Sequence, residues 1–147
     1  MKQSKRFKSN EQGATLVEYS IALLVFLTVM FAVIEFGRAL WVHNALADAA
    51  RRGARYAVVN SADEAKVKNM VVYGDEDGGD TPVVPNLTTD NVTVTYSDLA
   101  VNNGKVSVSI DAYQFQFVIP IVGTTITMPS YTTTLTGESA GFVPDPI

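Results

Sequence analysis

Few side chains of this 147-residue chain have the types and spacing that catalysis or metal binding requires. His43 is the one histidine and cysteine is absent, which argues against a histidine-based triad and against a transition-metal cluster. The acidic, glycine-rich stretch 75–80 raises calcium as an alternative, but the glutamate that completes an EF-hand loop is missing at the required distance. We therefore predict a protein that is not an enzyme and has no catalytic residue, cofactor or metal, with 75–80 as a solvated turn.

One carboxylate stands out by its position. Glu18 lies at the N-terminal edge of an uninterrupted apolar run from Tyr19 to Ile34. Residues 1–13 carry four Lys or Arg and one Glu, a net +3, whereas the remaining residues carry a net −7. A basic flank marks the cytoplasmic side of a membrane segment, and an acidic remainder argues against nucleic-acid binding. An acidic residue inside a membrane helix costs ~2.5–3.5 kcal/mol, so we expect Glu18 to have a role inside the membrane or an assembly.

The length of the apolar run determines where the membrane span begins. Tyr19 to Ile34 gives about 24 Å of helix, short of the ~30 Å hydrocarbon core. A start at Ala14 gives about 31 Å, so the predicted span is 14–34 and Glu18 lies about one turn inside it. At the far end Glu35 and Arg38 are three residues apart on one helical face, and we predict that they pair and mark the outer boundary.

Three interpretations of this N-terminal region compete. The first is a plain signal anchor and the second a cleaved secretory signal, whose apolar region should have ~7–15 residues followed by a small-residue site. The small residues at 45–47 lie too far beyond the run for that second interpretation. The third is a leader that ends at Gly13 and leaves the apolar helix on the mature chain. This interpretation uses the basic leader, Gly13 and Glu18 together, and the anchor remains the alternative.

Three stretches of sequence resemble a known family. GATLVEY at 13–19 resembles the processing site of type IV pilin-like proteins, and IEFGRAL at 34–40 and NALADAARRGARY at 44–56 resemble the TadE-like branch of the tight-adherence (Flp) pilus system. The resemblance implies that a prepilin peptidase cuts between Gly13 and Ala14. It also implies that Glu18, with Tyr19 beside it, serves assembly by pairing with the Ala14 amine of another subunit. Since a buried carboxylate and a buried ammonium offset each other only at the correct stagger, such a pair would fix the register.

The resemblance carries expectations about function. It implies a structural pilin-like subunit, a minor pilin or pseudopilin, that acts in adhesion, biofilm formation or secretion. Its partners would be other pilin subunits, the prepilin peptidase, the assembly platform and its ATPase, and membrane lipid, with no nucleic acid. The chain would cross the bacterial inner membrane once, with its C-terminal head outside the cytoplasm, and then enter a pilus at the cell surface. The alternative is an uncleaved, membrane-anchored binding module with an extracytoplasmic head.

The helix is predicted to continue past the membrane. Residues 38–58 contain no proline and many good helix formers, so 14–58 is predicted as one helix with an amphipathic extension at 38–58. Ala45, Ala49, Gly53 and Ala57 form a small-residue ladder at a spacing of four. The ladder allows close helix–helix approach in an assembly, or it packs beneath the chain's own head. Gly37 is either a flexible joint or a tolerated helical glycine.

Residues 59–147 are predicted as a globular α+β head, preceded by the 1–13 leader and the 14–58 helix. A capping-box spacing at 61–64 predicts a short helix over 62–73, ended by Gly74. The stretch 75–91 is predicted as loop. Alternating apolar residues then predict an antiparallel sheet of about four strands, with a hairpin turn at Asn103-Gly104. The buried parity changes after Ile110, which predicts a β-bulge near 111–112 or a strand whose buried face changes, and a turn is predicted at 120–123.

Overall fold

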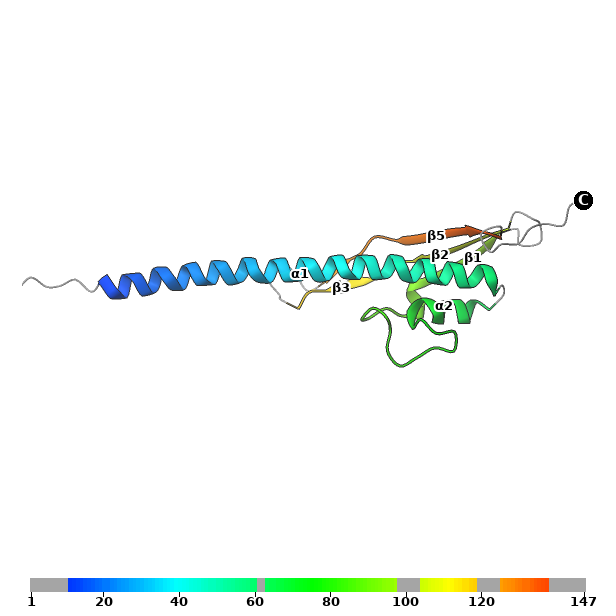
Figure 1. The fold of residues 1–147 in the computed structure, drawn as a ribbon, viewed down its shortest axis with the longest axis horizontal. Helices are drawn as coiled ribbons and strands as arrows, with labels where there is room; N and C mark the ends of the chain where they lie inside the picture. Colours follow the sequence, from blue (N-terminus) through cyan, green and yellow to red (C-terminus); the bar gives the residue numbers. More distant parts are fainter. Residues whose placement is uncertain (1–10, 61–62, 98–103, 119–124, 138–147) are drawn as a thin grey trace, which may run out of the picture. The chain divides into compact units, whose positions relative to one another are not determined.

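The computed structural model describes residues 11–60, 63–97, 104–118 and 125–137. The fold is α+β, as predicted: a long N-terminal apolar helix, a short helix and small antiparallel sheets (Figure 1). Its helices are α1 (Glu11–Val59), α2 (Glu64–Val72) and the 3-10 turn η1 (Thr89–Asn91). Its strands are β1 (Val92–Ser97), β2 (Lys105–Ile110), β3 (Gln114–Gln116), β4 (Thr125–Thr127) and β5 (Tyr131–Thr136).

The chain divides into two compact units, Met1–Gly37 and Arg38–Ile147, which we term the N-terminal unit and the head unit. Helix α1 contributes to both and has no break in its helical assignment from Glu11 to Val59. In the N-terminal unit the apolar side chains are exposed. Two of its hydroxyl groups bond within the helix: Ser20 Oγ donates to the Leu16 carbonyl at 2.7 Å and Thr28 Oγ1 to the Leu24 carbonyl at 2.8 Å. Such i−4 bonds allow a hydroxyl in an apolar helix without an unpaired polar group.

The strands of the head unit form two sheets rather than the single sheet of about four strands that the sequence predicted. One has the order β1-β2-β5 and the other pairs β3 with β4, and all pairings are antiparallel. The parity change after Ile110 marks the transfer between them, not a bulge. Ala112 adopts φ +55°, which turns the chain after β2, and Tyr113 and Phe115 are then buried from the second sheet.

The core of the head unit lies between the C-terminal part of α1, helix α2 and the strands. Figure 1 shows β1, β2 and β5 alongside this part of α1, with α2 next to it. The largest fully buried side chains are Phe115, Leu46, Leu87, Ile110, Val67, Val71, Val72, Val84, Val106 and Val108. Gly53 lies where α1, α2 and β2 meet, since a Cβ added there would come within 2.2 Å of Val71 Cγ2 and 3.5 Å of Val108 Cγ1. The amphipathic extension of α1 is therefore the helical layer of the head's core.

Helix α2 begins later than predicted. Its N-cap is Asp63, whose carboxylate accepts hydrogen bonds from the Ala65 and Lys66 amides at 3.1 and 3.3 Å. The expected start at 62 is wrong, because the aspartate caps the helix in extended backbone and the first helical residue is Glu64. The C-terminal prediction is confirmed: Gly74 has φ +79° and its amide donates to the Met70 carbonyl at 3.2 Å, the left-handed ending that glycine adopts without a steric penalty.

Several predictions fall outside the described residues. These are most of the leader, the Ser61 position of the capping box, Asn103 of the hairpin turn, the 120–123 turn and the C-terminal tail. The hairpin itself is seen in its strands, because β1 and β2 pair in antiparallel register from Val92↔Ile110 to Ser97↔Lys105.

Candidate functional site

The predicted processing and assembly residues lie on the N-terminal unit's part of α1. A Cβ added to Gly13 would have no atom within 4 Å, so this segment is open in the single chain. Glu18 is exposed and Tyr19 is 67% exposed. Glu18 makes no hydrogen bond or ion pair with any other described residue. Ala14 and Glu18 are four residues apart and so lie on one face of α1.

Helix α1 is long and apolar enough to cross a membrane. Within it, an 18-residue window has a mean hydropathy of 2.3, and none of that window is buried within the chain. Among the described residues it is the one helix with this property. An apolar surface of this length without any covering from its own chain is expected to lie in lipid or against other subunits.

The two residues predicted as a boundary pair have different surroundings. Glu35 is 7% exposed and is the one buried charged residue among those described. Arg38 lies over the Phe115 ring, with the guanidinium carbon 4.4 Å from the ring centroid, and donates to the Gln116 carbonyl. This cation–π contact fastens the start of the head unit's helix to β3. The pairing of Glu35 with Arg38 stays a prediction.

A pocket of about 270 Å³ opens around Arg38. Its lining residues are Arg38, Trp41, Val42, Pro85, Asn86, Tyr113, Phe115, Gln116, Phe117 and Val118. Two of them are largely exposed, Trp41 at 55% and Val118 at 74%. No local pattern in the sequence links these three segments, which are 27 or more residues apart along the chain.

The small-residue ladder lies beneath the chain's own head. Ala49, Gly53 and Ala57 are buried, and Ala45 is half-buried. Of the two interpretations left open by the sequence, packing against the head describes these contacts in the single chain. The small side chains allow α2 and β2 to approach α1 closely.

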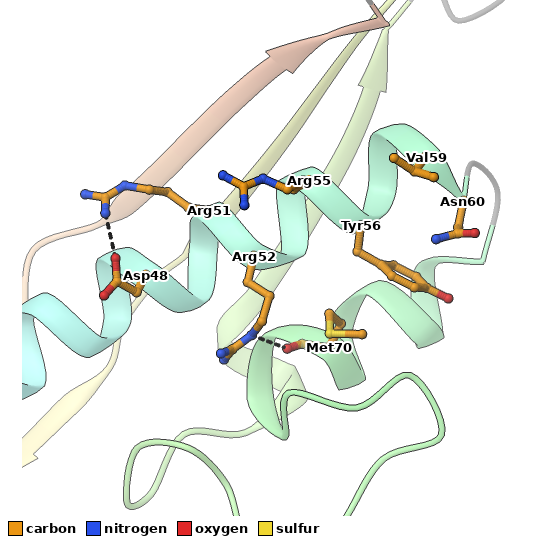
Figure 2. Close-up of a pocket in the computed structure, with 8 residues that line it drawn as sticks. All are labelled: Asp48, Arg51, Arg52, Arg55, Tyr56, Val59, Asn60 and Met70. Carbon is orange, nitrogen blue, oxygen red and sulfur yellow. Dashed lines mark hydrogen bonds and ion pairs between the residues drawn. The ribbon is translucent and has the colours of Figure 1, made fainter. Parts of the chain in front are cut away.

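A second, open groove of about 630 Å³ lies along the C-terminal turns of α1 (Figure 2). Three arginines line it: Arg51 pairs with Asp48 at 2.6 Å, Arg52 Nε donates to the Met70 carbonyl at 3.2 Å, and Arg55 is exposed. Asp48 and Arg52 have the spacing of four that favours an ion pair on a helix, but Arg52 is turned toward α2 and Asp48 pairs with Arg51 instead. Three arginines against one carboxylate make the groove basic, although the chain as a whole is acidic.

Tyr56 connects this groove to the acidic turn. Its hydroxyl donates to the Glu76 carboxylate, and this bond raises the pKa of Tyr56 to about 12. Lys66 Nζ lies 3.8 Å from the same carboxylate, and Asn69 donates to the Glu76 carbonyl at 3.1 Å. Among the described residues, no group of three or more His, Cys, Asp or Glu side chains is placed to hold a metal ion.

His43 takes part in packing within the head unit. Its Nδ1 lies 2.8 Å from the Tyr131 hydroxyl, and the two rings are edge-on with centroids 5.2 Å apart. The pair joins α1 to β5, and burial raises the pKa of Tyr131. We find no nucleophile–base pair beside His43 in the described part of the chain, so this geometry fits a structural contact.

The chain combines one apolar, membrane-length N-terminal helix with a small α+β head. Residues 13–55 match the model of the TadE-like protein family, so the chain contains a TadE-like domain over that range. The match begins at Gly13 and covers the three stretches that showed the resemblance, apart from the final tyrosine. No curated protein and no solved structure matches the chain.

Proposed function

We propose that this chain is a minor pilin or pseudopilin of a tight-adherence pilus machine, used for adhesion, biofilm formation or secretion. The observation that carries the proposal is the TadE-like match over 13–55, because it begins at Gly13 and contains Glu18. In this function a prepilin peptidase cuts between Gly13 and Ala14, and α1 remains on the mature chain. The head after α1 supports a minor rather than a major subunit, since the major subunits of this pilus type are expected to be short helices almost without a head.

The chemistry of Glu18 supports an assembly role. Its carboxylate lies among exposed apolar side chains and has no partner among the described residues. An unpartnered carboxylate in lipid costs ~2.5–3.5 kcal/mol. The Ala14 amine released by cleavage on a neighbouring subunit would offset that cost only at one axial stagger, so the pair would drive association and fix its register.

The expected location follows from the same arrangement. The basic leader stays in the cytoplasm, α1 crosses the inner membrane, and the head lies outside the cytoplasm before it enters the pilus. Other pilin subunits, the peptidase, the assembly ATPase and the platform proteins are the partners in this proposal.

The test compares Glu18→Ala and Glu18→Gln in cells that contain the pilus machinery. Intact-mass measurement should find all three chains starting at Ala14, because the substitutions leave Gly13 in place. Close interfacial charge pairs couple by ~1.5–7 kcal/mol, so incorporation into sheared pili should fall by about tenfold or more in both variants. Wild-type incorporation by either variant would contradict the role of Glu18.

The second candidate is an uncleaved, membrane-anchored binding module. The basic groove favours it, because Arg51, Arg52 and Arg55 present a concentration of positive charge outside the span. A mature chain that retains Met1 in cells with an active prepilin peptidase would support this candidate. The groove would then bind an acidic peptide, and Arg51→Gln with Arg55→Gln should weaken that binding.

A further inference from the structure

The head unit has exposed apolar side chains on its first helical residues, directly after β3 and on β4. Trp41 is 55%, Val118 is 74% and Ile126 is 51% exposed, and Phe117 is half-buried. We call these four residues the apolar rim. Trp41, Phe117 and Val118 line the same pocket as Arg38. Ile126 is paired with Phe115 in the β3–β4 register, and residues directly opposite share a face of the sheet.

The rim has the chemistry of a membrane–water interface. Most side chains that line the pocket are aromatic or aliphatic, and the Asn86 and Gln116 amides bond to each other at 3.3 Å. The lining has one formal charge, the Arg38 guanidinium, and no carboxylate. Tryptophan is enriched at the level of lipid headgroups, and arginine extends its charge to the same level while its stem stays in apolar surroundings. The sequence that joins β3 to β4 also has no charged side chain from 119 to 123.

Part of this surface follows the predicted span closely in the sequence. Arg38 and Trp41 come four and seven residues after Ile34, the last residue of that span. Each headgroup layer is ~5–8 Å thick outside the hydrocarbon core. Arg38 is itself bound to Phe115 and Gln116 of β3. A bilayer that takes up the apolar run of α1 therefore ends within a few residues of Arg38 in the sequence.

We propose that the apolar rim is a second membrane contact, in which Trp41, Phe117, Val118 and Ile126 rest in the lipid headgroup layer of the leaflet from which α1 emerges. This inference rests on the membrane insertion of α1 in the proposed function, and it goes beyond it by giving the head its own lipid-binding surface. Before assembly, the contact would hold β3 and β4 at the membrane surface.

The chain has no cysteine and a single tryptophan, so labels and native fluorescence both report single positions. Full-length Val118→Cys is labelled with an environment-sensitive nitrobenzoxadiazole group and reconstituted into phosphatidylethanolamine–phosphatidylglycerol vesicles, with and without acyl-brominated lipid. Leu27→Cys, in the middle of the apolar run, reports insertion. Thr95→Cys is the matched control: it is an exposed strand residue whose partner is Ser107. It lies away from the Ile110–Tyr131 end of the sheet, which contacts His43.

The proposal expects quenching and a blue-shifted emission at Leu27 and at Val118, with several-fold weaker quenching at Thr95. If the label at Leu27→Cys is quenched but the label at Val118→Cys is quenched no more than that at Thr95→Cys, the rim proposal is overturned and the membrane insertion of α1 stands. No quenching at either Leu27 or Val118 overturns the rim together with the insertion that the proposed function needs. A third outcome is a blue-shifted emission at Val118→Cys that depends on the protein-to-lipid ratio and is not quenched by brominated lipid. This outcome also overturns the proposal, because a second copy of the chain then covers the surface.

A second measurement uses Trp41 in the unlabelled chain. In vesicles with brominated lipid its emission should be quenched, and Val118→Asp with Ile126→Asp should reduce that quenching several-fold. Both side chains are largely exposed, so the double variant should keep the near-ultraviolet circular dichroism of the folded head. Unchanged Trp41 quenching in a folded double variant would overturn the contribution of β3 and β4.

Discussion

Gly53→Ala gives the most direct test of how the head is packed. An exposed helical glycine replaced by alanine usually stabilises a helix by ~1 kcal/mol. At Gly53, however, the added Cβ would lie 2.2 Å from Val71 Cγ2, more than ~1 Å inside the ~3.5 Å contact distance of two carbons. The other near atoms, Val108 Cγ1 at 3.5 Å and Val71 Cβ at 3.6 Å, are at ordinary contact distance. The Cγ2 methyl group of Val71 therefore decides whether Gly53→Ala stabilises or destabilises the head.

The magnitude follows from how little that methyl group can move. Val71 is fully buried on α2, and a β-branched side chain in a helix is largely confined to one χ1 rotamer. Overpacking a closed core costs ~1–3 kcal/mol, which outweighs the propensity gain of ~1 kcal/mol. We expect Gly53→Ala to lower the free energy of unfolding of the head by about 1 kcal/mol or more.

The assay is urea unfolding of the full chain in mild detergent, followed by near-ultraviolet circular dichroism. Val71→Ala alone should destabilise by ~2 kcal/mol, through two lost methyl groups and the cavity they leave. In the Val71→Ala chain, Gly53→Ala should raise the unfolding free energy instead of lowering it. The difference between its two effects is a coupling energy, expected within the ~0.5–3 kcal/mol range of contacting residues. Gly37→Ala is the control, because its Cβ would have no atom within 4 Å. A Gly53→Ala chain as stable as the wild type, with no change of sign, would refute the reasoning.

Three further substitutions are predicted together. Asp63→Ala should lower the unfolding free energy by ~1 kcal/mol because it removes the N-cap of α2. Asp63→Asn should keep most of the wild-type stability, since asparagine also caps helices. Equal losses for the two variants in urea unfolding would exclude capping as the cause. Hydrogen bonds from Ser109 and then Ser130 lower the pKa of Asp111 from its ordinary 3.8, so its stabilisation is present above 3.8 and is lost as pH falls through the lower folded value. In Asp111→Asn the melting temperature should therefore fall less as pH decreases below 3.8, and an unchanged fall would contradict this role of Asp111. The pKa of Tyr56 is raised from 10.0 to about 12, so its stabilisation is complete below pH 10 and is lost as pH rises toward 12. Tyr56→Phe should remove this alkaline decline, and identical melts of the two chains across that range would count against the Glu76 bond.

The N-terminal half of the protein could be predicted from sequence because its properties are local. An unbroken apolar run, a basic flank and the absence of proline specify a long apolar helix whatever else the chain does. The resemblance to the TadE-like family likewise depends on short stretches of adjacent residues, and the match at 13–55 agrees with it. Alternating apolar residues also predicted an antiparallel hairpin, and β1 and β2 pair in this way.

Local patterns could not decide which distant segments meet. The parity change after Ile110 was visible in the sequence, but only the φ of Ala112 shows that it transfers the chain to a second sheet. The spacing of Asp48 and Arg52 favours an ion pair in an isolated helix, yet Arg52 donates instead to the Met70 carbonyl of α2, which also accepts the Gly74 amide. A carbonyl oxygen has two lone pairs and can accept a second donor from a neighbouring element. No spacing rule along one helix reveals that neighbour.

By itself, the sequence determined that this protein has a membrane-length apolar helix with an α+β head after it, because hydrophobic period and turn chemistry act over a few residues. The tertiary structure alone decided that the small-residue ladder lies beneath the head. It also brought Arg38, Trp41 and β3 together as one surface. These arrangements depend on close packing between segments far apart in the chain, where the shape of each buried side chain selects its neighbours.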